Sequence, residues 1–416
     1  MWQATRSLFR AFRYRDHKNI IKIVSASIIA VFFTVYTASA FSSGAKLFAT
    51  LFSDSASGDE NYNRVYVIGL IVAAVVILVY TFMGGFKAVC TTDLIQGLMM
   101  IVAILTVPVL AYAILTFDTS FSSALAAKGV EQPAQFLNFF VNGDGTPVSA
   151  VSIISNLAWG LGYFGMPHIL VRFMAVKSNE EIKKSRKIAV VWVIISLTAS
   201  CLIGLIARGY LTAQLDDATS ESVFIRTIQQ LFSGNGVLIF IGGIFLCGIL
   251  AAIMSTADSQ LLVTASAVSE DLYKGAVKKD ASEKSSLLVG KIAVAVVAVI
   301  AFFIALNPKS SIMGLVSDAW AGFGSAFGPV VLLALFWKRS TLSGAISGMA
   351  TGALTVIIWD YIPLVNGQTL YTATNLYSLV VGFGLALIVN VIVSLLSKKP
   401  SKEITDEFDS IKNIEV

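Results

Sequence analysis

The chain has 416 residues, of which 56% are hydrophobic and only 13% are charged, against about 25% charged residues in an ordinary soluble domain. So much apolar surface cannot be buried in one core beneath a polar shell, which excludes a water-soluble enzyme. The formal net charge of +5 comes from scattered loop residues and excludes a nucleic-acid binder. The long, continuous apolar stretches instead predict an all-α, polytopic protein of the lipid bilayer, not a β-barrel.

Ten stretches are long and apolar enough to cross a bilayer, whose hydrocarbon core of about 30 Å needs about 20 helical residues. The predicted spans, in chain order, are residues 20–44, 64–83, 94–116, 149–173, 188–208, 236–264, 287–306, 312–337, 342–360 and 375–397.

The charges between these spans predict the orientation of the chain. Basic and acidic loops alternate along the sequence, and basic loops face the cytoplasm in membrane proteins. With ten spans, both termini are then expected in the cytoplasm, in a multi-pass protein of the plasma membrane. We expect residues 1–19 to form a cationic cytoplasmic segment, residues 20–397 the membrane domain, and residues 398–416 a polar cytoplasmic tail.

The fourth span contains a sequence that a continuous helix tolerates poorly. Residues 159–168 read WGLGYFGMPH, with three glycines and Pro167. Proline removes a backbone donor and clashes with the preceding turn, so a break is expected at membrane depth. Broken helices near the midplane are typical of transporter binding sites. Trp159 and Tyr163 lie four residues apart, on one face, and suit a small zwitterion; the alternative is a packing kink with core aromatic rings.

The sixth span carries polar side chains crowded into residues 255–260. Hard cations prefer oxygen ligands, and the hydroxyls of Ser255 and Thr256 follow the carbonyl of Ala252 by one turn, which suits Na⁺. Asp258 is a candidate ion-coupling residue. A charge at the bilayer centre costs roughly 2.5–3.5 kcal/mol, so this carboxylate is expected to face the bundle interior. The alternative is that these residues form hydrogen bonds between helices.

Two other carboxylates stand at the ends of predicted spans. Asp93 opens the third span, where it is either an N-cap at the cytoplasmic edge or an ion-coupling residue. Asp318 lies near the outer end of the eighth span, where interface solvation and a functional role are both consistent with the sequence. Neither the two histidines nor the three cysteines have metal-site spacing, and no nucleophile–base pair suggests an enzyme.

Four motifs resemble the sodium:solute symporter family, and in particular its proline-transporting members: residues 77–93, 159–175, 249–274 and 318–339. The likeness runs from about residue 12 to about residue 397. It implies a LeuT-type inverted-repeat core with alternating access, Na⁺ as the coupling ion, and L-proline as the imported substrate. No obligate protein partner is evident from the sequence.

The resemblance also implies roles for individual residues. In family members, the residues that match Ala252, Ser255 and Thr256 bind Na⁺. Asp93 matches an acidic residue that is linked to Na⁺ release toward the cytoplasm. The residues that match the substrate site are Tyr36, Trp159, Tyr163, Pro167 and Ser259.

The sequence departs from the family pattern in two respects. Met166 stands where glutamine is common, and Asp258 and Asp318 stand where some relatives have neutral residues. Family members also begin with three further helices, so we expect the first repeat here to be incomplete. Two alternative functions therefore remain. One is a truncated chain that cannot transport, and the other is a Na⁺ symporter for another small solute, such as pantothenate or a sugar.

Overall fold

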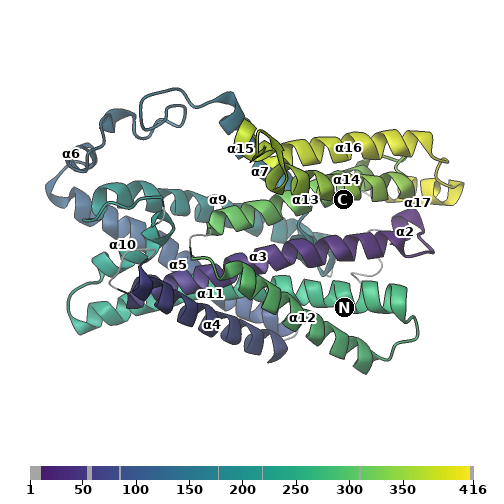
Figure 1. The fold of residues 1–416 in the computed structure, drawn as a ribbon, viewed down its shortest axis with the longest axis horizontal. Coiled ribbons are helices and arrows are strands. Elements are labelled where there is room, and N and C mark those ends of the chain that lie inside the picture. Colours follow the sequence, from purple (N-terminus) through teal and green to yellow (C-terminus); the bar gives the residue numbers. More distant parts are fainter. Residues whose placement is uncertain are drawn as a thin grey trace.

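A computed structural model describes residues 11–53, 59–83, 86–176, 178–217, 219–308 and 311–412. Within these ranges, nine helices are long and apolar enough to cross a membrane, and they pack lengthwise into one bundle (Figure 1). The predicted all-α membrane fold is therefore confirmed. The nine are α3 (Ile20–Phe52), α4 (Glu60–Met83), α5 (Phe86–Asp118), α9 (Asn179–Tyr210), α11 (Gly236–Ser266) with its π-helical continuation η3 (Ala267–Val277), α12 (Glu283–Ala305), α13 (Ile312–Phe336), α14 (Leu342–Tyr361) and α16 (Ser378–Leu396).

The predicted fourth span is not one helix but two. Helix α7 covers Ala150–Gly162 and helix α8 covers Pro167–Met174, so the chain leaves the helical path between them. Pro167 occupies the first turn of α8, where its missing N–H removes no intrahelical hydrogen bond. The predicted break is confirmed: α7 ends at Gly162, and Pro167 is the first residue of α8.

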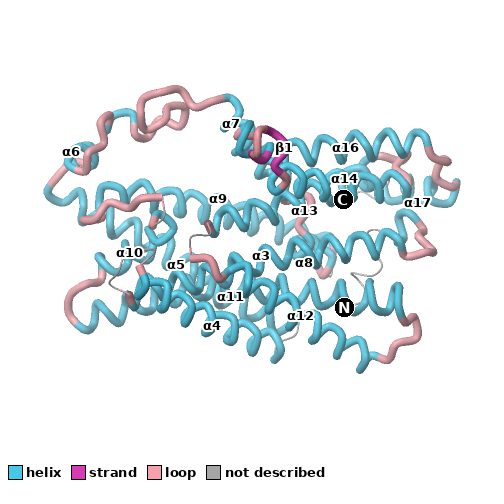
Figure 2. Tube along the Cα trace, viewed as in Figure 1, coloured by secondary structure: helices cyan, strands magenta, loops and turns pink. Residues whose placement is uncertain are grey.

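The remaining elements are short and lie mostly in the connections, as Figure 2 shows. A two-residue turn at Asn366 and Gly367, both with positive φ, joins the antiparallel strands of the small sheet. Residues 1–10 of the predicted cationic segment lie outside the described residues. The short elements are α2 (Ala11–Tyr14), α6 (Phe121–Ala127), η1 (Pro133–Gln135), η2 (Ser220–Ser222), α10 (Val223–Leu231), β1 (Pro363–Val365), β2 (Gln368–Thr369), α15 (Leu370–Thr374) and α17 (Lys402–Lys412).

Helix α13 is the centre of the packing. In its apolar stretch 78% of the residues are buried, whereas only 11% are in the corresponding stretch of α9. It packs against α3, α14 and α16. Small residues make this close approach feasible: a Cβ added at Gly322 would lie 2.1 Å from the ring of Phe32. The helix that carries Trp320 and Asp318 is therefore held on several sides.

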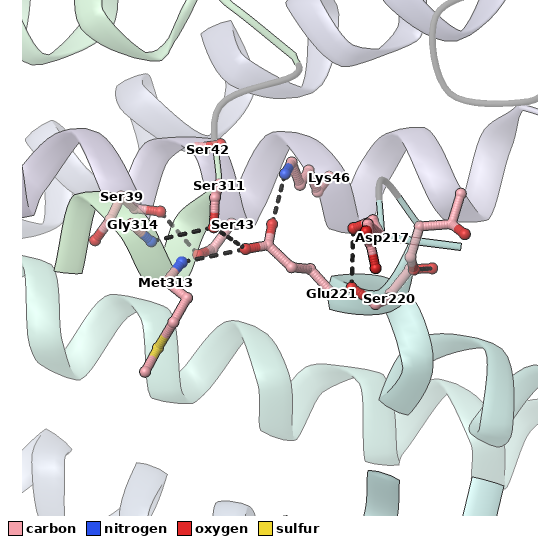
Figure 3. A network of polar contacts seen from close by, with 12 residues as sticks. Ser39, Ser42, Ser43, Lys46, Asp217, Ser220, Glu221, Ser311, Met313 and Gly314 are labelled. Carbon is pink, nitrogen blue, oxygen red and sulfur yellow. Dashed lines mark hydrogen bonds and ion pairs between the residues drawn. The ribbon is translucent and has the colours of Figure 1, made fainter. Parts of the chain in front are cut away.

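A polar network fixes the end of the bundle that lies away from both described termini (Figure 3). Glu221 accepts hydrogen bonds from Lys46 Nζ (2.6 Å), Ser311 Oγ (2.9 Å) and the backbone N–H of Met313 (3.1 Å). Burial by itself raises the pKa of Glu221, but these hydrogen bonds and the Lys46 charge outweigh it and hold the pKa below its usual range. One carboxylate thus ties a loop to α3 and to the first turn of α13.

Candidate functional site

Four aromatic side chains meet where α7 ends, and we call Trp159, Tyr163, Trp320 and Tyr377 the ring cluster. Trp159 stacks on Trp320, with ring centroids 5.8 Å apart, and on Tyr377, at 5.6 Å. Tyr163 meets Trp320 edge-on at 4.9 Å. Offset and edge-to-face arrangements of this kind are favourable for aromatic pairs. The structure thus brings the predicted pair together and adds two rings to it.

Hydrogen bonds and one glycine hold the ring cluster in place. Trp320 Nε1 donates to the carbonyl of Trp159 (3.0 Å), and Tyr377 Oη donates to the carbonyl of Ser317 (2.8 Å). A Cβ added at Gly162 would lie 1.9 Å from Trp320 Nε1, so only glycine leaves room for the indole. Trp320 and Tyr377 are buried, whereas 43% of Tyr163 is exposed. The cluster is a rigid aromatic wall with one accessible ring.

Tyr36 lies beside α8 and is not a member of the ring cluster. Its ring meets that of His168 at a centroid distance of 6.3 Å, and Phe33 meets the same imidazole at 5.8 Å. His168 directly follows Pro167, which is buried at the start of α8. The predicted residues Tyr36 and Pro167 are therefore both neighbours of His168, Tyr36 through a ring contact and Pro167 along the chain.

The other end of α8 carries a charged contact, and we call Asp93, Arg172 and Ser259 the polar junction. Arg172 Nη2 donates to Asp93 Oδ2 and to Ser259 Oγ (2.9 Å), and Ser259 Oγ donates to Asp93 Oδ2 (3.5 Å). The side chain of Arg172 is 47% exposed and that of Asp93 is 15% exposed. Asp93 lies inside α5, which begins at Phe86, so the N-cap interpretation is wrong. The carboxylate instead connects α5 to α8 and α11.

The three predicted Na⁺ ligands lie together on α11. Ser255 Oγ and Thr256 Oγ1 both donate to the carbonyl of Ala252, at 3.1 and 3.0 Å. These bonds are made within one helix, whereas Ser259 of the same stretch bonds to α5 and α8, so the alternative of hydrogen bonds between helices holds for Ser259 and not for Ser255 and Thr256. Each hydroxyl oxygen keeps its lone pairs while it donates, so the three oxygens fit a small hard cation. Ser259 lies one turn further along the same face.

Asp258 faces the bundle interior, as expected, and is fully buried. Neither of its carboxylate oxygens has a hydrogen-bond partner among the described residues, and the same holds for both amide atoms of the buried Gln260. No hydrogen bond joins Asp258 to the polar junction or to the oxygens of Ala252, Ser255 and Thr256. Buried polar atoms without partners are rare and indicate bound water or an ion.

Sequence reasoning missed Trp320, Tyr377 and Arg172 as site residues. A signal existed for Arg172, because a charge within an apolar span marks a functional position. Trp320 lies in the family motif at residues 318–339, in which Asp318 was considered as a functional residue and Trp320 was not. Tyr377 carried no signal, because its contact with Trp159 joins residues more than two hundred positions apart.

A bundle of membrane-length helices, with aromatic and polar side chains gathered around a broken one, defines a secondary transporter. Residues 7–352 match the sodium:solute symporter family. A sodium/proline symporter 2 from Staphylococcus saprophyticus is 41% identical over 410 residues, which cover 97% of this chain and 74% of the relative. The osmoregulated proline transporter OpuE of Bacillus subtilis is 42% identical over 393 residues, with 94% and 73% covered. The chain belongs to the sodium:solute symporter family, whose members are transporters and not enzymes.

The solved structures agree at the level of the fold. A Na⁺-coupled sialic acid symporter, in a substrate-bound outward-open state, matches with a TM-score of 0.65 over 91% of this chain and 76% of that one. The sequence identity is 18%, so this likeness concerns the fold alone. It confirms the predicted symporter fold class.

Proposed function

We propose that this protein is a Na⁺-coupled symporter that imports L-proline across the cell membrane. Family membership supports Na⁺ coupling, and the names of the relatives support proline. One observation carries the proposal: α8, the second half of the broken span, links the substrate residues to the ion residues. It begins with Pro167 beside the break, and through Arg172 it contacts both Asp93, the ion-coupling candidate, and Ser259 of α11.

The substrate would lie at the break between α7 and α8. In this proposal the ring cluster covers the apolar pyrrolidine ring, with Tyr163 as its accessible face. Tyr36 and Pro167 border the site from the α8 side, and Ser259 lies toward the ion residues. Backbone groups freed by the break face the charged ends of the zwitterion, as in other transporters with discontinuous helices.

The coupling ion would bind at Ala252, Ser255 and Thr256, where three oxygens already converge. Asp93 then acts in ion release toward the cytoplasm, because Arg172 is in place to neutralise its carboxylate when Na⁺ has left. Asp258 supplies a further, fully buried carboxylate on α11, the helix of the three proposed ion ligands. Each Na⁺ that enters a cell contributes about 2.3 kcal/mol per 100 mV of membrane potential. Both termini are cytoplasmic in this arrangement.

Uptake of labelled proline into membrane vesicles tests the proposal. We expect uptake that requires an inward Na⁺ gradient and is not competed by pantothenate or glucose. The match covers 97% of this chain but only 74% of the S. saprophyticus relative. The assay therefore includes a second protein, in which the N-terminal segment of such a relative is joined to this chain. Uptake by the second protein alone would favour the truncated, transport-incompetent alternative. Competition by pantothenate or a sugar, without competition by proline, would overturn the substrate.

Ser255→Ala and Thr256→Ala test the ion site. We expect each to raise the Na⁺ concentration needed for half-maximal uptake without lowering the amount of protein in the membrane. Thr264→Ala is the matched control, because its hydroxyl donates to the carbonyl of Gln260 on the same helix in the same way (2.8 Å). Equal Na⁺ dependence in all three variants would assign the hydroxyls a structural role only.

A further inference from the structure

A cavity of about 300 Å³ lies at the end of the bundle where α2 and α17 meet the first turn of α14. Figure 1 shows α2 and α17 together at this end, opposite the Glu221 network. The cavity is lined by α2, by residues 340–343 and by residues 397–404. No residue of the ring cluster or of the polar junction lines it. It is therefore separate from the proposed transport site.

The lining of this cavity is cationic. Among the described residues that line it, Arg13 and Lys398 are the charged ones, and none carries a carboxylate. The hydroxyl-bearing residues Ser340, Ser343 and Ser397 also line it. Among the described residues, Lys398 has no ion-pair partner. A cavity with two cations, several hydroxyls and no acid suits an anion with several oxygen acceptors.

Arg13 is held in a fixed position beside the cavity. Its Nε donates to the carbonyl of Ala334 (3.1 Å), and its Nη2 lies 3.3 Å from the carbonyls of both Trp337 and Lys338. Its Nη1 is buried and has no hydrogen-bond partner in the described part of the chain. Burial lowers the pKa of Arg13, although Tyr14 and Glu407 oppose this effect. Hydrogen bonds therefore fix the orientation of the guanidinium, but they do not satisfy all of its buried N–H donors.

Arg339, which directly precedes the lining residue Ser340, shows the same pattern. Its Nη2 donates to the carbonyls of Ser397 (2.7 Å) and Leu395 (3.2 Å), while its Nη1 is likewise buried without a partner in the described ranges. Arg13 thus lines the cavity, and Arg339, which does not line it, is anchored next to a lining residue. Each retains unused N–H donors, and buried donors left unsatisfied are costly.

Three acidic residues of α17 form ion pairs with cations other than Arg13 and Lys398. Glu403 and Glu407 pair with Arg15, at 3.2 and 3.4 Å, and Asp409 pairs with Lys338. These carboxylates are already engaged by cations that do not line the cavity. Arg13 and Lys398 consequently keep positive charge for a ligand from outside the chain.

We propose that this cavity binds a phosphate group, either that of an anionic lipid headgroup or a soluble phosphate. Its volume exceeds that of a single phosphate, and its donors can surround the phosphate oxygens. The lining is positive, as juxtamembrane segments that attract anionic lipids are. The proposed orientation places the cavity at the cytoplasmic surface, where headgroups of the inner leaflet lie. The phosphate chemistry itself does not depend on that orientation or on the proposed substrate.

The test compares Lys398→Gln with Lys399→Gln in the purified full chain. The two lysines are adjacent and carry the same charge, but only Lys398 lines the cavity. Native mass spectrometry counts phosphatidylglycerol retained against phosphatidylcholine, and thermal unfolding compares inorganic phosphate with chloride at equal ionic strength. Arg13 is left unchanged because it also anchors the end of α13.

We expect the unsubstituted protein to retain phosphatidylglycerol in preference to phosphatidylcholine, to be stabilised by phosphate, or both. Lys398→Gln should weaken that binding about fivefold, the factor that corresponds to about 1 kcal/mol for one lysine near a membrane surface. Lys399→Gln should leave it unchanged. Retention of lipid without a phosphate effect identifies a headgroup site, and a phosphate effect identifies a site open to soluble phosphate. Equal losses in both variants, or no preference and no stabilisation, would overturn the proposal.

Discussion

The ring cluster lies at the break of the fourth span and the polar junction lies at the far end of α8, and different forces hold the two groups. The ring cluster consists of stacked, mostly buried rings and depends on close approach at Gly162. The polar junction is an ion pair whose arginine is half exposed and whose partners lie on two other helices. Packed rings have one good arrangement, whereas exposed charges exchange partners at little cost. In the proposed function, the packed ring cluster is therefore the part suited to shape recognition, and the polar junction is the part that can rearrange when an ion arrives.

Gly165→Ala should have the largest effect and tests the packing at the break. A Cβ at this position would lie 2.3 Å from the backbone carbonyl oxygen of Phe323 in α13, and backbone cannot move aside as a flexible side chain does. We expect a loss of up to about 3 kcal/mol in the free energy of unfolding, together with loss of uptake. Gly160→Ala is the control, because no atom lies within 4 Å of its added Cβ. Equal thermal unfolding midpoints would contradict the close packing.

Glu221→Gln measures how much the largely buried ion pair between Lys46 and Glu221 contributes to the free energy of unfolding. Lys46 would keep only a neutral partner, and we expect a loss of about 1–2 kcal/mol at neutral pH. Folding lowers the pKa of Glu221. The ionised carboxylate therefore contributes its full stabilisation at a pH above the pKa of about 4.3 that an unfolded glutamate has. The contribution is lost as the pH falls through the lower folded value. Thermal unfolding between pH 3 and pH 7 should therefore show the two proteins converging in acid. A constant difference over that range would refute the assignment.

Trp320→Phe tests the ring cluster by removing one hydrogen bond while an aromatic ring remains. The lost bond to the carbonyl of Trp159 is expected to cost about 1 kcal/mol. Trp359→Phe is the matched control, since its Nε1 donates to the carbonyl of Leu376 at the same 3.0 Å. Both variants should lose similar stability, but only Trp320→Phe should raise the KM for proline. A raised KM in both would show that the effect is general loosening of the bundle.

A double-mutant cycle on Asp93 and Arg172 should give the smallest effect on stability. Because Arg172 is half exposed, solvent screens the pair, and we expect a coupling energy of about 0.5–1 kcal/mol between Asp93→Asn and Arg172→Gln. Uptake should nevertheless fall in each single variant. A coupling energy of 3 kcal/mol or more would show a locked, structural pair and would remove the contrast between the two groups.

Local features of the sequence predicted much of this arrangement. Pro167 and its neighbouring glycines predicted the break, because their backbone chemistry acts within one turn. The spacing of Ala252, Ser255 and Thr256 likewise predicted three oxygens on one face. Both inferences depend on residues that are close in the chain, and the structure agrees with both.

Long-range contacts were beyond reach of the same reasoning. The sequence allowed Asp93 to be an N-cap because its partner in the structure, Arg172, is 79 residues away in the chain. Tyr377 was not recognised because its contact with Trp159 depends on how α16 packs beside α7. Side-chain pairs of this kind are set by tertiary packing, and a single sequence contains no direct record of it.

The separation between the ring cluster and the proposed ion residues of α11 is tested most directly by binding of radioactive Na⁺ to the purified protein without proline. We predict that Ser255→Ala weakens Na⁺ binding, whereas Trp320→Phe leaves it unchanged although it raises the KM for proline. If Trp320→Phe weakened Na⁺ binding as much as Ser255→Ala, the ring cluster and the ion residues would form one site, and the separation would be contradicted.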